Sequence, residues 1–193
     1  MPALMVATGN ETTIKNLLAA YVGESNARAQ YKAFADQADA EGLSGVASLF
    51  RAAARAEQIH ATNQARVLRQ MGAEARAEVS AFKVRNTLEN LKTALATERY
   101  EIESMYPGFI AEATAHINST ASRAFFWALE AEKTHHRLYS EAIPLVEAGQ
   151  TTSWIGAARE FYVCPVCACT SEQKAADNCT ICGYPAERVE SVS

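Results

Sequence analysis

The chain has 193 residues, of which 49% are hydrophobic and 21% charged, and this is the composition of a soluble globular protein slightly longer than one domain. Its formal net charge of −4 excludes a generally basic nucleic-acid-binding or membrane-surface protein. No apolar run approaches the roughly 20 residues that span a bilayer, and the start, MPALMVATGN, lacks the basic flank and apolar core of a signal peptide. We therefore expect a cytoplasmic protein.

Long helices are predicted as far as Gly149. No proline falls between Pro2 and Pro107, and apolar residues recur at helical spacing. The third helix should kink or pause at Pro107-Gly108. Four amphipathic helices of this length predict an all-α, four-helix bundle. The expected helices cover residues 12–39, 44–70, 81–106 and 119–148.

The character of the sequence changes after the bundle. We divide the chain into a bundle (1–149), a linker (150–160) in which Trp154 and Ile155 are expected to dock, and a tail (161–193). All five cysteines lie in the tail, which begins with a β-prone segment. A unit of this size is smaller than the roughly 40 residues at which a hydrophobic core alone suffices, so we expect a metal to hold it together.

A short motif occurs twice in the bundle. Glu57 and His60 form one A-E-x-x-H segment, and Glu132 and His135 form another, 75 residues later. A further glutamate precedes each copy, and these two glutamates, Glu24 and Glu98, are 74 residues apart. The pattern is typical of a bundle with pseudo-twofold symmetry.

These polar residues interrupt helical stripes that are otherwise apolar or aromatic. One such pair would most simply face solvent, but four stripes with the same feature place several carboxylates in one core. Buried carboxylates cannot all stay ionised without cations, and residues three apart on a helix can grip one metal. The oxygen and imidazole donors suit iron or manganese. The predicted two-metal set is Glu24, Glu57, His60, Glu98, Glu101, Glu132 and His135.

Two tyrosines lie on the same stripes. Tyr31 and Tyr106 can donate hydrogen bonds to the carboxylates or can serve only as packing residues. We expect the carboxylates and His135 to converge, with His60 close by.

The cysteines form two CxxC pairs separated by eleven residues, an arrangement that predicts a tetrahedral four-thiolate site. The predicted ligands are Cys164, Cys167, Cys179 and Cys182. The spacing does not choose between iron and zinc. Cys169 is predicted to be a free thiol, with replacement of Cys167 as a ligand the alternative.

Taken together, these motifs resemble the rubrerythrin family. The segments that carry the resemblance are GESNAR with Tyr31, AEQIH ending at His60, E-x-x-E from Glu98 leading to MYP, AEKTH ending at His135, and the tail from YVC to CGYP. The resemblance implies a ferritin-like bundle with two iron ions and a rubredoxin-like tail with one iron, zinc being possible there. It also implies that Glu101 and His60 exchange as ligands when the iron changes oxidation state. Ala168 departs from the family, which usually has glycine after this cysteine, and Cys169 beside it is unusual.

The function that the resemblance implies is a non-haem peroxidase in oxidative-stress defence. Hydrogen peroxide would be reduced to water, with electrons from a reductase or a rubredoxin passing through the tail iron. It further implies a homodimer with electron transfer between subunits, and neither nucleic acid nor membrane as a partner. Two alternatives are a ferroxidase or iron-handling bundle, and a non-catalytic bundle that carries a structural zinc ribbon.

Overall fold

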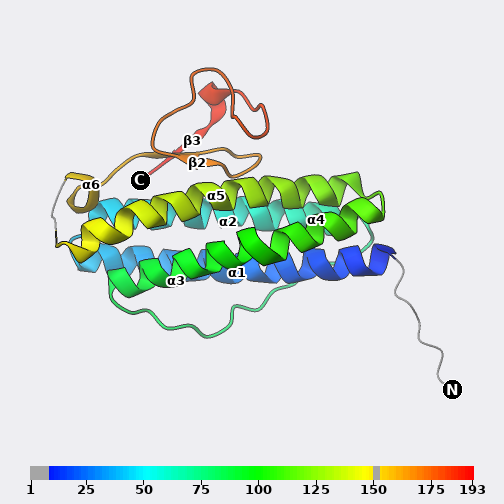
Figure 1. Cartoon of the computed structure of the whole chain (residues 1–193), viewed down its shortest axis with the longest axis horizontal. Helices are drawn as coiled ribbons and strands as arrows, with labels where there is room; N and C mark the ends of the chain where they lie inside the picture. The colour runs from blue at the N-terminus through cyan, green and yellow to red at the C-terminus, as the bar shows by residue number, and fades with distance from the viewer. Residues whose placement is uncertain (1–8, 150–152) are drawn as a thin grey trace.

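The computed structural model describes residues 9–149 and 153–193, and it is dominated by long, closely packed helices (Figure 1). The start of the chain and residues 150–152 of the predicted linker lie outside the described residues. The bundle elements are α1 (Gly9–Ala40), α2 (Ser44–Gln70), α3 (Thr87–Tyr100), η1 (Glu101–Met105), α4 (Tyr106–Ala115) and α5 (Ser119–Glu147). Because α3, η1 and α4 follow one another without a loop, they form one continuous rod, and the bundle has four rods.

Glycine ends the second helix where the sequence predicts it. Gly72 has φ +77°, a left-handed conformation that costs other residues more. The next amide, that of Ala73, donates a hydrogen bond back to the carbonyl of Leu68 at 2.9 Å, which closes the last turn. The predicted range 44–70 is the observed one.

The predicted start of the third helix is wrong. The helix begins at Thr87 rather than at residue 81, because the side chain of Asn86 accepts a hydrogen bond from the amide of Glu89 and caps the helix there. Residues 73–86 instead form a long connection that runs beside the bundle (Figure 1). This crossover makes α2 and α3 run in the same direction.

The interruption expected at Pro107-Gly108 appears as a π-helical turn just before the proline. The amide of Tyr106 donates to the carbonyl of Glu101, five residues back, and Pro107 falls in the first turn of α4, where its missing N–H is tolerated. The rod therefore continues past the proline with one widened turn.

The tail lies on α2 and α5 of its own bundle (Figure 1). Ile155, Phe161 and Val163 are buried in the same core as the bundle helices, and Trp154 packs against that core. Arg55 of α2 donates two hydrogen bonds, of 2.6 and 2.7 Å, to Glu190. The tail elements are α6 (Ser153–Gly156), β1 (Phe161–Val163), β2 (Thr170–Ser171), η2 (Ala186–Arg188) and β3 (Glu190–Val192). The three strands form a small antiparallel sheet in the order β2-β1-β3.

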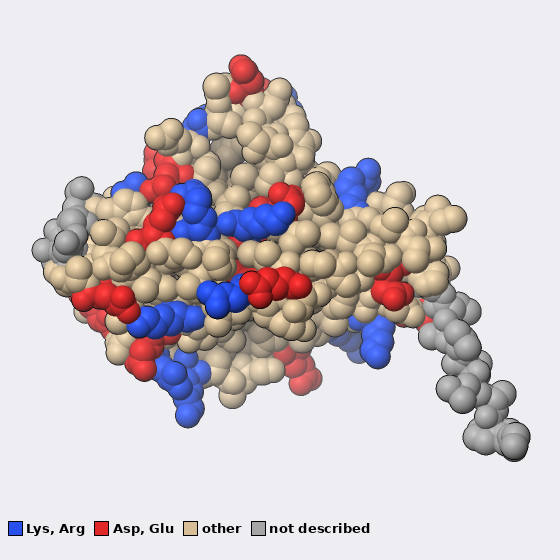
Figure 2. All heavy atoms as spheres, viewed as in Figure 1, with Lys and Arg blue, Asp and Glu red and all other residues tan. Residues whose placement is uncertain are grey.

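Charged side chains of both signs alternate on the face shown in Figure 2, without a large patch of one sign. Within the described residues, we find no helix with both the length and the apolar character that membrane crossing requires.

Candidate metal centres

Six of the seven predicted bundle residues form two overlapping groups inside the bundle. In each group the four candidate ligand atoms lie within 4.8 Å of one another. Glu57 and Glu132 belong to both groups. The first group also contains Glu24 and His60, and the second also contains Glu98 and His135.

His60 marks the first group. Its Nδ1 lies 2.9 Å from Oε2 of Glu57 and 2.9 Å from Oε1 of Glu132. The same nitrogen lies 3.8 Å from Oε1 of Glu24. Two carboxylates from α2 and α5 thus face the imidazole at close range.

His135 marks the second group in the same manner. Its Nδ1 lies 2.6 Å from Oε2 of Glu132 and 3.6 Å from Oε1 of Glu57. Each of these two glutamates therefore turns one oxygen toward His60 and the other toward His135. Two carboxylates shared in this way would suit a pair of metal ions, one in each group.

The donor set fits a pair of cations. Glu24, Glu98 and His135 are fully buried, and Glu57 and His60 are 1% exposed. Within the described part of the chain, one oxygen of each of Glu24, Glu57 and Glu98 has no hydrogen-bond partner. Buried polar atoms are seldom left unpaired, and unpaired carboxylates least of all, so bound cations are the natural partners.

The pKa values of these groups reflect the crowding of negative charge. Burial, followed by repulsion from Glu132, raises the pKa of both Glu57 and Glu98 well above the usual range. Burial alone would lower the pKa of His60, but Glu132 and its neighbours raise it well above the usual value. Burial lowers the pKa of His135 to about 4, which keeps that imidazole neutral and able to bind a metal.

The hydrogen bonds around the carboxylates include both predicted tyrosines. Tyr31 donates to Oε1 of Glu98 at 2.6 Å, and the hydroxyl of Tyr106 donates to Oε1 of Glu24. Gln64 also donates to Glu24, at 3.2 Å, and the sequence analysis missed this residue. Its position seven residues after Glu57 on the same helix, two turns along the same face, was the available signal.

Glu101 differs from the other six residues. It is buried, with 5% of its surface exposed, but it belongs to neither group. His60, by contrast, lies within the first group. The convergence of Glu101 with the other carboxylates stays a prediction: their negative charges act on Glu101, although it lies outside both groups. The helix is regular from Glu98 to Glu101, whose amide bonds to the carbonyl of Thr97, and the π-helical turn follows from Glu101 onward.

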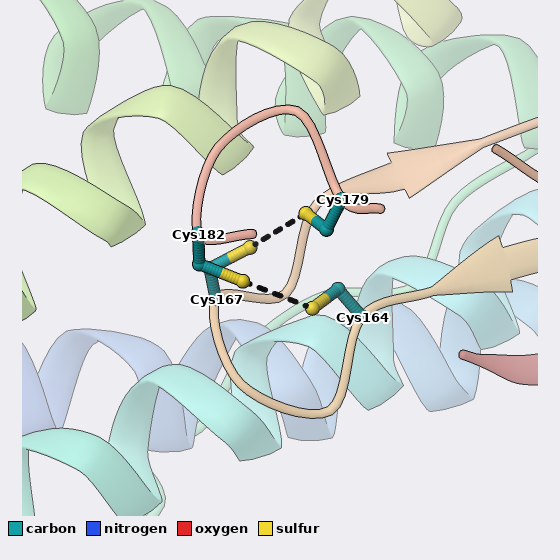
Figure 3. A group of neighbouring side chains, drawn as sticks. All are labelled: Cys164, Cys167, Cys179 and Cys182. Atoms are coloured by element: carbon teal, nitrogen blue, oxygen red, sulfur yellow. Dashed lines mark hydrogen bonds between the residues drawn. The ribbon is translucent and has the colours of Figure 1, made fainter. Parts of the chain in front are cut away.

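The four predicted tail thiols point toward one another from two loops (Figure 3). Their sulfurs lie within 4.8 Å of one another, with Cys164 and Cys182 3.5 Å apart and Cys167 and Cys179 3.4 Å apart. A metal about 2.3 Å from each sulfur would require separations of about 3.8 Å, so the cage needs little adjustment. A hydrogen bond from Cys167 lowers the pKa of Cys164 to about 5.

The two loops of the cage have the same backbone pattern. The amide of Ala168 donates to the carbonyl of Cys164 at 2.9 Å, and that of Gly183 donates to Cys179 at 2.8 Å. Both residues have positive φ, +66° for Ala168 and +75° for Gly183. Alanine therefore occupies the conformation that glycine prefers. Cys169 is a half-buried free thiol whose pKa burial raises to about 12.

One side chain connects the two centres. Oγ1 of Thr170 lies 3.0 Å from Nε2 of His135 and donates to the carbonyl of Ala168 at 3.0 Å. Because its proton is used on Ala168, Thr170 accepts from the Nε2–H of His135, which leaves Nδ1 free to bind a metal. This role of Thr170 does not follow from the sequence, since no local pattern shows that the tail folds back onto α5.

The fold and the two donor sets define a carboxylate bundle for two metals that carries a four-thiol domain. A model of the Rubrerythrin family matches residues 15–143. Rubrerythrin-2 of Clostridium acetobutylicum is 32% identical over 183 residues, which cover 94% of this chain and 97% of that protein. Nigerythrin of Nitratidesulfovibrio vulgaris is 34% identical over 176 residues, 90% of this chain and 83% of that protein. The chain belongs to the rubrerythrin family.

Solved structures agree with this assignment. The fully reduced, all-ferrous state of nigerythrin has a TM-score of 0.83 at 30% identity, over 99% of this chain and 96% of that one. A bacterioferritin from Desulfovibrio desulfuricans has a TM-score of 0.68 at 20% identity, over 78% and 90%, and shows the fold alone. The predicted fold class, a ferritin-like bundle with a small rubredoxin-like domain, is confirmed, as is membership of a family of diiron oxidoreductases with a four-cysteine site.

Proposed function

We propose that this protein is a diiron peroxidase that reduces hydrogen peroxide to water and receives its electrons through the tail. The contact between Thr170 and His135 carries this proposal, because it joins the four-thiol cage to the carboxylate site by one side chain, at 3.0 Å. A protein that only stored iron would need no such connection.

The donor atoms suit iron in both places. In the bundle, Glu57 and Glu132 would bridge the ions, and the end ligands would be Glu24 with His60 and Glu98 with His135. When bound there, two ferrous ions supply the two electrons that cleavage of the oxygen–oxygen bond requires. The four thiolates of Cys164, Cys167, Cys179 and Cys182 would hold a single iron, which carries one electron at a time.

The surrounding residues hold the ligands in place. Thr170 fixes the orientation and tautomer of His135, and Tyr31 fixes Glu98. Tyr106 and Gln64 both bind Glu24. Glu101 is buried but lies outside both groups, and its exchange with His60 as a ligand is what the family resemblance implies.

The tail lies on its own bundle, so electrons would reach the site within one chain. Asn63 of α2 donates to the carbonyl of Val166 at 2.8 Å, and the amide of Thr170 donates to Thr134 of α5 at 3.2 Å. These bonds hold the first cysteine loop against both helices. The homodimer, the cytoplasmic location and the external reductase or rubredoxin remain predictions.

Stopped-flow mixing of anaerobically reduced, iron-loaded protein with hydrogen peroxide tests the proposal. We expect fast oxidation of the bundle iron, followed by oxidation of the tail iron with its visible charge-transfer bands. A ferroxidase would instead react faster with oxygen than with peroxide. A colourless tail that binds zinc, with no peroxide consumption, would support the non-catalytic alternative and reject the proposal.

A further inference from the structure

A groove on the side of α1 and α3 reaches the carboxylate site at Glu101. It has a volume of about 440 Å³ and lies between α1, α3 and η1. The tail covers the site from the side of α2 and α5, so this groove approaches from a different side. Glu101 is the most exposed of the seven bundle candidates and lines the groove.

The side of the groove formed by α1 includes three small residues. Ala19, Gly23 and Ala27 follow one another at intervals of four and so lie on one helix face. Gly23 has no conformational reason to be glycine, since it lies within a helix and φ is not positive. Glycine is the least favourable residue after proline in a helix interior. A Cβ there would meet no atom within 4 Å, so close packing does not require glycine either. What glycine provides at this position is open space.

A buried, unpaired polar group points to a ligand in this space. Within the described part of the chain, the carboxylate of Glu101 makes no hydrogen bond or ion pair. A molecule with a polar head could meet Glu101 at the inner end of the groove.

The size and the lining of the groove indicate the rest of that molecule. A water molecule occupies about 30 Å³ in the liquid, and hydrogen peroxide is only slightly larger. The volume of the groove is therefore far larger than hydrogen peroxide requires. Much of the lining is apolar or aromatic, a surface that gains from contact with an alkyl or aryl group. The apolar lining includes Val22, Tyr100, Met105 and Phe109.

We propose that alkyl and aryl hydroperoxides are substrates of this protein, with the organic group in the groove and the hydroperoxide head at Glu101, and that Gly23 provides the necessary room. The inference rests on the proposed peroxidase function. The reaction balances as ROOH with two protons and two electrons giving ROH and water. The oxygen–oxygen bond breaks, and the electrons come from the reduced diiron pair.

The experiment compares the iron-loaded wild-type protein with Gly23→Leu. For cumene hydroperoxide we expect Gly23→Leu to lower kcat/KM by at least about tenfold, the scale on which apolar pockets discriminate substrates, with a change of less than about threefold for hydrogen peroxide. Gly108→Leu is the matched control, because Gly108 is also helical, also has open space at its Cβ and lies outside the groove. The smaller Gly23→Val should show an intermediate effect.

A second measurement does not depend on catalysis. Saturation-transfer NMR with 2-phenyl-2-propanol on zinc-loaded protein should show binding to the wild type and Gly108→Leu but not to Gly23→Leu. Equal binding to Gly23→Leu, or reduction of hydrogen peroxide but not of cumene hydroperoxide by the wild type, would overturn the inference alone. Gly23-dependent binding without reduction of either peroxide would instead reject the peroxidase function and keep the groove as a binding site.

Discussion

The two candidate metal centres of this protein depend on the fold in opposite ways. In the bundle, the ligands project from long helices that have a large core of their own, and the ligands repel one another. In the tail, four thiols project from two loops, and the sheet has strands of only two or three residues. We infer that bound metal relieves the repulsion between buried carboxylates in the bundle, whereas in the tail it supplies most of the folding stability.

The largest expected effect is the loss of the tail when its cage is broken. The double variant Cys179→Ser, Cys182→Ser should lose the tail metal and the ordered structure from about Phe161 onward, while the bundle stays helical. Steady-state peroxide reduction should fall by more than about 100-fold, because electron transfer needs the tail metal. Amide hydrogen exchange and circular dichroism measure the two parts separately.

Cys169→Ser serves as the control, since Cys169 lies outside the group of four thiols. It should keep the tail ordered and the visible spectrum unchanged. Native-like amide protection of the tail in the double variant would show that the tail has a sufficient core without metal.

In the bundle, removal of a carboxylate that belongs to both groups should weaken metal binding without unfolding the helices. Glu57→Gln should bind at most one ion in place of two and lose most peroxidase activity. The metal-free form should become more stable, by about 1–4 kcal/mol, because one buried carboxylate is gone from a crowded set. Metal analysis and denaturant unfolding check both expectations. Glu130→Gln is the control, since Glu130 lies on the same helix as Glu132 but is partly exposed and outside both groups.

The same crowding should make the stability of the metal-free protein depend on pH. Carboxyls such as Glu57 and Glu98 have folded-state pKa values raised above the unfolded value of 4.5, so the stability that they add below this pH is lost as the pH rises through the raised values. His60 acts in the same direction, with its contribution complete below pH 6.5. The pKa of His135 is lowered to about 4, so His135 acts in the opposite direction, but only as the pH falls below 6.5.

Above pH 6.5, therefore, these bundle ligands only destabilise the metal-free protein as the pH rises, whereas the thiol of Cys164, whose pKa is lowered to about 5, acts in the opposite direction. The free energy of unfolding of a metal-free Cys164→Ser variant, which lacks this opposing thiol, should therefore fall between pH 6.5 and 9. The metal-loaded protein should show no such decline. Equal pH profiles with and without metal would mean that the carboxylates are not mutually repelling.

The same difference between bundle and tail explains which features the sequence predicts. Helix ends follow from local signals such as Gly72, and the ligands of the bundle follow from polar residues on apolar stripes. The π-helical turn at Glu101 and the placement of Glu101 outside both groups depend on packing between helices, which spacing along one helix does not reveal. Thr170 meets His135 only because the tail folds back onto α5.

The contact between Thr170 and His135 should have a smaller effect, on the affinity of the bundle for metal. Thr170→Val leaves the Nε2–H of His135 buried without an acceptor, and loss of such a partner typically weakens metal binding about 10-fold. Competition with a chelator for the metal ion bound by the group that contains His135 measures this change. Thr170→Ser keeps the hydroxyl and should restore wild-type affinity, whereas equal weakening in Ser and Val would assign the effect to packing of the methyl group.

The smallest effect is expected at the first cysteine loop, where Ala168 stands in place of the glycine that is usual in the family. Ala168 adopts φ +66°, a conformation that costs a residue with a Cβ about 1 kcal/mol or more relative to glycine. Ala168→Gly should therefore stabilise the metal-loaded tail by up to about 1 kcal/mol, less the small loss of packing from the buried methyl group. Thermal unfolding followed at the tail's visible bands reports this region alone, because the bundle lacks thiolate ligands. Ala176→Gly, at an exposed loop position without positive φ, should be neutral or destabilising. Destabilisation by Ala168→Gly would mean that packing of this methyl group against the bundle core outweighs the backbone strain, so that the tail depends on its contact with the helices as much as on its metal.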